Sequence, residues 1–265
     1  MELSDFARRI VETERLEEKL SRPPSELSDD DPGSPTRVPA PGRPGNLRIV
    51  PAGEAPVPRL DGMSDAAQRP RIVHALANHE LQAVELFAWA ILAFPDTPAG
   101  FRKGLLRVLL DEQRHTRMYI SRLRDLGAEF GDHPVSGYFW NKLADVHSPA
   151  AFVCAMSLTF ENANLDHTIE SADASRRAGD EKTAAVIDRV HRDEITHVEF
   201  GWKWLRHFKR PDQSMWEAYT ENVTWPLRAA KAKGRVFHVD GRVAAGLDPE
   251  FIERLAAAAP DDETP

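Results

Sequence analysis

Two stretches of this sequence, LLDEQRHTRMY (residues 109–119) and HRDEITHVEFGW (residues 191–202), contain the same short motif, D-E-x-x-H. The motif residues are Asp111, Glu112 and His115 in the first stretch and Asp193, Glu194 and His197 in the second. On a helix, residues three positions apart share a face, about 5–6 Å apart at Cβ, so each Glu and His can reach a common ion. The repeat indicates two related helical halves that each present ligands for a metal.

The composition limits the classes of function. The chain has 265 residues, 42% of them hydrophobic and 29% charged, and a net charge of −8. No apolar run approaches the ~18 residues that span a bilayer, and residues 1–20 lack a secretory pattern, so we expect a cytoplasmic protein with no membrane segment. The acidic balance makes nucleic acid an unfavoured partner. Cys154 is the only cysteine, which excludes a disulfide framework and four-thiolate metal sites.

Residues 65–210 show four long helical patterns separated by short breaks. We expect helices at about 65–94, 98–126, 149–178 and 181–209. The connection between the second and the third is longer and rich in turn residues, and no stretch shows convincing strand alternation. Two helical hairpins joined by one crossover are the plan of a four-helix bundle, so the predicted fold class is all-α.

Residues 1–64 and 211–265 flank this predicted bundle. Residues 1–20 have the pattern of one amphipathic helix. Residues 21–64 are rich in Pro, Gly, Ser and Asp and cannot form a long helix, but their scattered apolar residues favour an arm that lies on the domain over a disordered tail. The expected helices of the C-terminal extension are at about 213–232 and 248–259.

The first and third helices of the bundle each offer one more carboxylate at a matching distance. Glu80 precedes Glu112 by 32 residues, and Glu161 precedes Glu194 by 33. Glu85 lies off the apolar stripe that contains Glu80, so we expect Glu85 to face solvent. The apolar residues on the Glu80 face are Val73, Leu76, Ala77, Val84, Phe87 and Ile91.

The predicted metal ligands are Glu80, Glu112, His115, Glu161, Glu194 and His197. Four carboxylates around two divalent cations sum to zero charge, which allows the set to be buried. A mixed oxygen and nitrogen set suits two Fe ions, Mn or a mixed Mn/Fe pair, with O2 as co-substrate. A ligating His usually donates its other ring N–H to a carboxylate, so we expect Asp111 and Asp193 to orient the histidines, each from the opposite helix.

Tyr119 and His191 are the further candidates for a catalytic role. Tyr119 follows Glu112 by seven residues and could donate a hydrogen bond or an electron, although packing is the favoured interpretation. His191 lies one turn before Glu194 and could be a third nitrogen ligand, although a neighbouring or core histidine is favoured.

Other residues on these helices also leave alternatives open. Asp166, His167 and Glu170 could line an access path, but ordinary surface polarity is the favoured account. Gly201 could leave room for a ligand or allow close helix packing, and the two are equally compatible with the sequence.

The ligand pattern resembles that of the ferritin-like di-metal carboxylate superfamily, in which one Glu from each of two helices joins a Glu-x-x-His from each of the other two. More narrowly, five stretches are similar to those of a bacterial ferritin-like family of unknown function: PGRPGNLRIVP, HALANHELQAVEL, DEQRH, FGDHPVSGYFW and RDEITHV. The similarity covers about residues 40–210. It implies a ferritin-like four-helix bundle and suggests that the Pro-rich arm belongs to the fold.

These residues favour a non-haem di-iron or Mn/Fe oxidase or hydroxylase that activates O2 and acts on a small organic substrate. One alternative is metal handling, as a ferroxidase or in peroxide removal. Another is a non-enzymatic helical scaffold with a structural metal. An electron donor is a further partner of the enzyme hypothesis, and a homodimer is compatible with it. The substrate, the choice of metal and the oligomeric state stay open.

Overall fold

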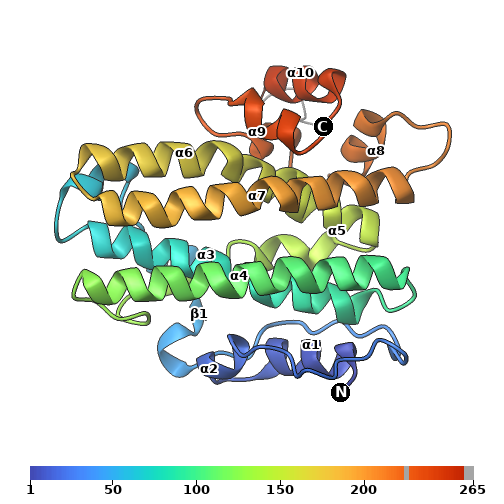
Figure 1. Ribbon diagram of the computed structural model, residues 1–265, viewed down its shortest axis with the longest axis horizontal. Coiled ribbons are helices and arrows are strands. Elements are labelled where there is room, and N and C mark those ends of the chain that lie inside the picture. Colours follow the sequence, from blue (N-terminus) through green and yellow to red (C-terminus); the bar gives the residue numbers. More distant parts are fainter. Residues whose placement is uncertain (224–226, 260–265) are drawn as a thin grey trace. The chain divides into compact units, whose positions relative to one another are not determined.

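The computed structural model describes residues 1–223 and 227–259, with residues 143–145 described by their backbone alone. Helices dominate these residues, as the sequence predicted (Figure 1). The chain divides into two compact units: unit 1 is Met1–Asn141 with Arg177–Lys182, and unit 2 is Lys142–Arg176 with Thr183–Pro265. Among the described residues, no helix is both long enough and apolar enough to cross a membrane.

A hairpin of two long helices forms the core of unit 1. Helix α3 spans Arg69–Ala93 and α4 spans Ala99–Asp125, close to the predicted limits. Pro98 precedes α4, and Gly127, with a φ of 77°, ends it in the left-handed region that suits glycine. Every residue from Leu81 to Phe94 is buried. Helix α3 is therefore covered on all sides along this stretch, not on a single stripe.

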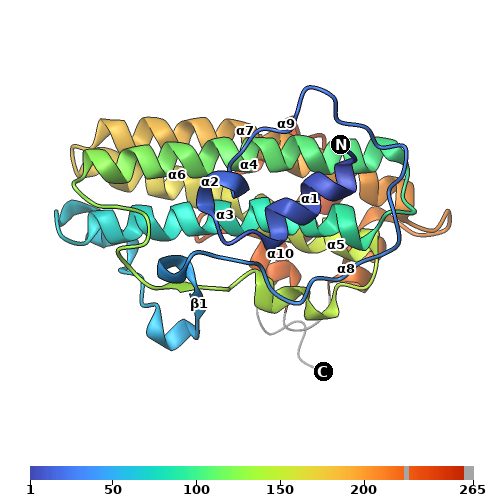
Figure 2. The ribbon, with the colours of Figure 1, turned by 90° about the horizontal axis from the view of Figure 1, so that it is seen from below.

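The N-terminal segment of unit 1 packs on the hairpin and contacts both α3 and α4. It contains α1 (Leu3–Glu12) and α2 (Leu16–Lys19), where the sequence predicted one continuous helix. The break comes at Thr13, whose backbone is extended. Helix α1 packs along α3 (Figure 2).

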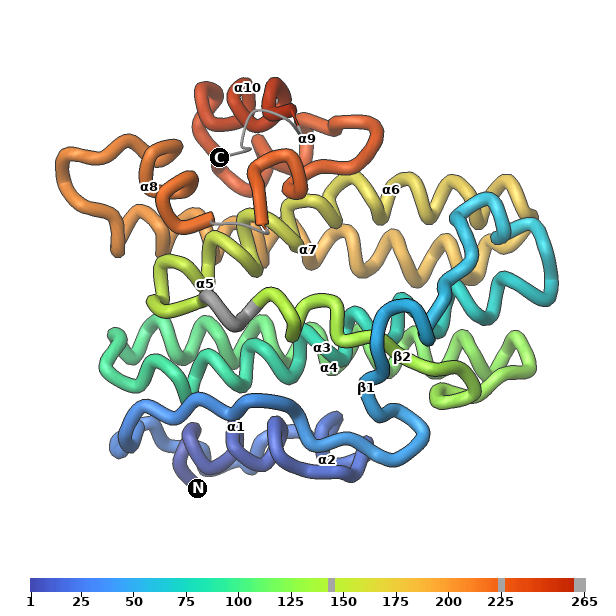
Figure 3. The backbone as a smooth tube through the Cα atoms, turned by 180° about the vertical axis from the view of Figure 1, so that it is seen from behind, coloured from blue at the N-terminus to red at the C-terminus, as the bar shows by residue number. Residues whose placement is uncertain are grey.

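The Pro-rich arm packs on the helical hairpin of unit 1, as predicted. Leu47 is buried, and the indole N–H of Trp89 donates to the carbonyl oxygen of Val38 at 3.1 Å. The arm also contributes β1 (Ile49–Val50), which pairs in parallel with β2 (Val135–Ser136) (Figure 3). These two-residue strands are too short for the sequence pattern to reveal.

A second hairpin forms the core of unit 2. Its first helical segment has three consecutive parts, and we call this segment the rod. Helix α7 follows after a turn in which Gly179 has a φ of 72°. The parts are α5 (Pro149–Ala155), a π-helix (Met156–Glu161) and α6 (Asn162–Arg177), and α7 spans Glu181–Phe208. The sequence predicted this rod and α7 but not the π-helix. A Cβ on Gly201 would lie 2.2 Å from Cβ of Ser157, so glycine serves close packing of α7 on the π-helix.

The C-terminal extension is made of shorter helices than predicted. A capping box of Ser214 and Glu217 starts α8 (Met215–Asn222). The expected helix at 213–232 is therefore wrong in its length, and its residues 224–226, which include a proline, lie outside the described residues. The elements that follow are a 3-10 helix (Ala229–Ala232), α9 (Val239–Ala244), which was not predicted, and α10 (Pro249–Ala257), which was.

Candidate functional site

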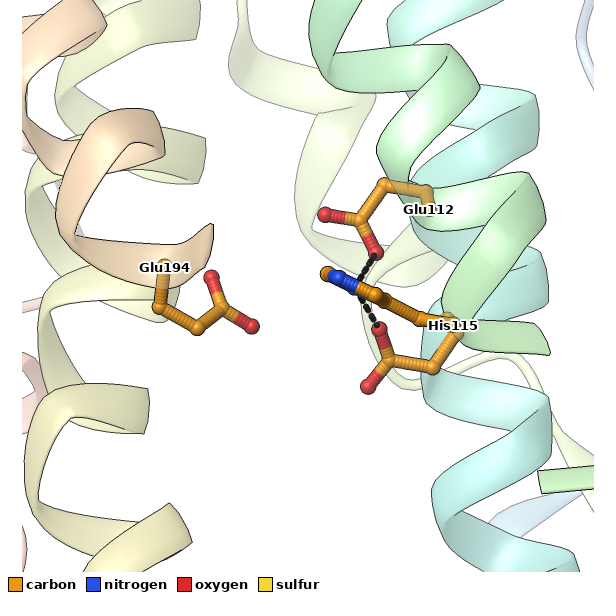
Figure 4. Close-up of side chains that lie close together, drawn as sticks. Glu112, His115 and Glu194 are labelled. Carbon is orange, nitrogen blue, oxygen red and sulfur yellow. Dashed lines mark hydrogen bonds and ion pairs between the residues drawn. The ribbon is translucent and has the colours of Figure 1, made fainter. Parts of the chain in front are cut away.

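Three of the six predicted metal ligands lie together in unit 1. Glu80 is on α3, Glu112 and His115 are on α4, and all three are at most 6% exposed. Nδ1 of His115 lies 3.1 Å from Oε2 of Glu80 and 3.5 Å from Oε2 of Glu112. Figure 4 shows Glu112 and His115 side by side on α4. One ligand atom from each residue lies within 4.8 Å of the others. We call this set triad 1.

The electrostatics of triad 1 favour a cation. Burial, followed by the like charge of Glu112, raises the pKa of Glu80 well above its ordinary value, and His115 opposes this shift. Two buried carboxylates this close repel each other unless a proton or a cation offsets one of them. A divalent ion would relieve that repulsion and would also take the imidazole nitrogen as a ligand.

The other three predicted ligands lie together in unit 2. Glu161 is the last residue of the π-helix, Glu194 and His197 are on α7, and all three are at most 3% exposed. Nδ1 of His197 lies 3.3 Å from Oε2 of Glu194. One ligand atom from each of the three lies within 4.8 Å of the others. We call this set triad 2.

Asn164 supports triad 2 and was missed by the sequence reasoning. Its side-chain amide donates to Oε1 of Glu194 at 3.1 Å. Asn164 lies three residues after Glu161 on the same helical face, which is the signal that could have identified it. Such a bond holds a carboxylate in one orientation and so prepares it as a ligand.

The two aspartates of the repeated motif lie partly exposed beside arginines of their own helices. Asp111 pairs with Arg114 at 2.7 Å, and its side chain is 27% exposed. Asp193 pairs with Arg189 at 3.1 Å. Their expected role in orienting the histidines stays a prediction.

Tyr119 and His191 have different surroundings. Tyr119 is 1% exposed and belongs to the core of unit 1, which agrees with the packing interpretation. His191 is half-buried, and its Nδ1 lies 2.8 Å from Oγ1 of Thr168. Burial lowers the pKa of His191, although the nearby carboxylate of Glu194 opposes this shift. Within the described ranges, the clusters compact enough to hold a metal include neither residue, and a catalytic role for either stays a prediction.

The expectation that Glu85 faces solvent is wrong. Its side chain is 0% exposed. Nη2 of Arg43 lies 2.7 Å from its Oε2, Nζ of Lys19 lies 3.2 Å from its Oε1, and the indole of Trp140 donates to Oε2 at 3.0 Å. The N-terminal segment and the arm cover this face of α3, so Glu85 is buried beneath them.

The interpretation of Asp166 as ordinary surface polarity is also wrong. Asp166 is fully buried and pairs with Arg242 of the C-terminal extension at 2.8 Å. Its carboxylate also accepts the backbone N–H groups of Gly234 and His238. The extension thus binds α6 through a buried ion pair.

Comparison with known proteins places the chain in a family. A family model described as "Protein of unknown function (DUF455)" matches residues 3–253. The chain belongs to the DUF455 family. An "Uncharacterized protein" of Haemophilus influenzae (strain ATCC 51907 / DSM 11121 / KW20 / Rd) is 27% identical to this DUF455 chain over 190 residues. That match covers 68% of the chain and spans 65% of the relative's length. No solved structure matches this DUF455 protein.

Proposed function

We propose that this DUF455 protein has a ferritin-like di-metal carboxylate site. In this proposal triads 1 and 2 together bind a pair of divalent iron or manganese ions and use it to activate O2 for the oxidation or hydroxylation of a small organic substrate. The observation that carries the proposal is that each unit buries the same donor set, two carboxylates and one imidazole nitrogen, with ligand atoms within 4.8 Å of one another. This donor set suits iron and manganese, and two such sets balance the charge of two divalent ions.

The residues of each triad fit such a metal pair. Buried carboxylates with no cation nearby are costly, and the raised pKa of Glu80 reflects that cost in triad 1. Nδ1 of His115 and Nδ1 of His197 are the nitrogen donors, each beside a carboxylate oxygen. Asn164 orients Glu194. When bound, a metal pair supplies the redox equivalents for reaction with O2, while the buried side chains exclude water.

The metal content of the purified protein tests the binding step. Protein from cells supplied with iron and manganese should contain about two ions per chain, measured by elemental analysis. Glu112→Ala removes a carboxylate from triad 1, and Glu194→Ala removes one from triad 2. A shared pair predicts that either variant loses both ions, because each ion would depend on both triads. Loss of one ion in each variant would instead show two independent sites and contradict the shared pair.

Glu199→Ala is the matched control, because Glu199 is an exposed acid of α7. It should retain the full metal content. Glu85→Ala is not a suitable control, since removing this buried carboxylate leaves two buried cations without their partner. Retention of both ions by Glu112→Ala and Glu194→Ala would overturn the assignment of the ligands.

Oxygen consumption tests the reaction. The loaded protein should consume O2 when an organic substrate is present, and the metal-free protein should not. Consumption that needs reduced metal but no organic substrate would favour metal handling. A loaded protein that consumes no O2 with any reductant or substrate in the screen would favour a structural metal.

A further inference from the structure

The buried cluster around Glu85 carries more positive than negative charge. Glu85 pairs with both Lys19 and Arg43, and the three side chains are at most 2% exposed. One carboxylate offsets only one of the two cations, so the protonated cluster has a net charge of +1. Burial lowers the pKa of Lys19, as expected when the charge is not fully compensated, and Glu85 opposes this shift. Such an excess is unfavourable in the interior unless an anion lies nearby.

The hydrogen bonds show which of the two cations has donors to spare. Lys19 uses its three N–H groups on the carbonyl oxygens of Ile10 and Val11 and on Glu85. Arg43 has five N–H groups: Nε and Nη2 donate to Glu85, and Nη1 donates to Asn78 at 2.8 Å. Among the described residues, two N–H groups of Arg43 therefore have no acceptor. The excess charge and the spare donors are on the same side chain.

Arg43 lines a cavity of about 370 Å³ that lies wholly within unit 1. Pro39, Pro41 and the indole of Trp140 provide apolar walls, and Arg48 and Asn141 add polar groups. The side chain of Arg48 is exposed and has no polar partner within the described part of the chain. The charged residues of the lining are one carboxylate, Glu14, and two guanidinium groups, Arg43 and Arg48. The lining therefore carries a net positive charge. Its volume is typical of a small-molecule site.

We propose that this cavity binds a small organic anion, with a carboxylate or phosphate on a flat apolar body. The anionic group would lie at Arg43 and Arg48, because guanidinium groups bind such oxygens with charge-assisted hydrogen bonds. The apolar body would pack on Trp140 and the prolines of the arm. This site goes beyond the proposed metal chemistry and does not depend on it, since every residue involved belongs to unit 1 and none is a predicted metal ligand.

Calorimetric titration of the full chain with benzoate tests the charge requirement. Benzoate should bind with a stoichiometry of one. Benzyl alcohol has a similar shape but no charge and should bind at least about 10-fold more weakly, because it cannot form charge-assisted hydrogen bonds with the guanidinium groups. Phenyl phosphate in the same assay shows which anionic group the site prefers. Equal binding of benzoate and benzyl alcohol, or no binding of either benzoate or phenyl phosphate, would overturn the proposal.

Two variants locate the binding site. Arg48→Gln should weaken the preferred anion about 10-fold or more. Arg59→Gln, a change at an exposed arginine of the arm outside the cavity, should have no effect. Binding of 4-nitrobenzoate should also quench tryptophan fluorescence in the wild type and much less in Trp140→Phe. Unchanged binding in Arg48→Gln, together with unchanged quenching in Trp140→Phe, would place the anion elsewhere and contradict the assignment.

Discussion

The two units bury an acid–arginine pair at equivalent places but compensate its charge differently. The pairs are Glu85–Arg43 in unit 1 and Asp166–Arg242 in unit 2. Each acid follows the first predicted glutamate ligand of its unit by five residues. Each arginine comes from a segment outside the helical hairpin, the Pro-rich arm in one unit and the C-terminal extension in the other. The internal repeat thus extends beyond the ligands to the way in which each hairpin is covered.

The pair in unit 2 is balanced, whereas the pair in unit 1 is not. Asp166 and Arg242 cancel in charge, and Arg242 also donates to backbone carbonyl oxygens such as that of Asn162 at 3.1 Å. Glu85 instead faces a second cation, Lys19. One arrangement of residues therefore serves two purposes. In unit 2 it fixes the extension to α6, and in unit 1 it leaves positive charge beside a cavity.

Removing the acid of each pair should give the largest loss of stability. Glu85→Ala leaves two buried cations without their carboxylate, and we expect the free energy of unfolding to fall by about 4–5 kcal/mol in urea titrations. Asp166→Ala leaves one buried cation and two backbone N–H donors without their acceptor. We expect the free energy of unfolding to fall by about 3–4 kcal/mol. Glu54→Ala, at an exposed acid of the arm, should change stability by less than about 0.5 kcal/mol. A larger loss in Asp166→Ala than in Glu85→Ala would contradict the greater excess of positive charge in unit 1.

Acid should destabilise the protein through a histidine of unit 1. Burial, aided by His133, lowers the pKa of His74 to about 4, and Nε2 of His74 accepts the N–H of Gly131. Because the folded pKa lies below the unfolded value of about 6.5, the unfolded chain binds the proton more readily. The free energy of unfolding is therefore unaffected by protonation of this histidine above about pH 6.5. It falls by about 2–3 kcal/mol as the pH falls towards 4.

Urea titrations at several pH values between 7 and 4 measure this effect. His74→Gln should be less stable at pH 7 but should lose less stability on acidification than the wild type. If both proteins lose the same amount, His74 is not the group responsible. Hydrogen exchange of α3 and α4 peptides would then show whether acid acts on unit 1 at all.

The smallest expected effect concerns the packing of α7 on the π-helix in unit 2. In Gly201→Ala the new methyl group would overlap the side chain of Ser157, so we expect a loss of about 1–2 kcal/mol. Gly53→Ala has open space around its Cβ and is the control. An unchanged unfolding midpoint in Gly201→Ala would mean that the two helices move apart at little cost. Their close packing would then not stabilise the fold.

The helices and both triads could be predicted from the sequence because they depend on local patterns. Apolar periodicity placed α3, α4 and α7 to within a few residues. The repeated motif, with one acid in an apolar stripe on each preceding helix, identified side chains that are buried together in each unit. Spacing along a helix translates directly into position on its face.

The surroundings of the triads could not be predicted because they depend on segments distant in the sequence. Helix α3 is buried on all sides from Leu81 to Phe94, so a single apolar stripe could not separate exposed acids from buried ones. The burial of Glu85 requires Lys19 and Arg43, and their contacts with α3 appear only in three dimensions. The π-helix likewise has no established signature in residue type, since its residues also suit an α-helix.

That π-helix makes the length of the chain before Glu161 as important as its composition. Each residue turns a helix by about 100°, and the wide i→i+5 turn accommodates one residue more than an α-helical turn would. If the same residues formed a plain α-helix, the extra residue would rotate the two sides of the rod against each other by about that angle. Either Glu161 would turn away from Glu194, or Ser157 would turn away from Gly201. Both positions therefore depend on the π-helix, and a substitution that favours a plain α-helix along this stretch would misplace one of them.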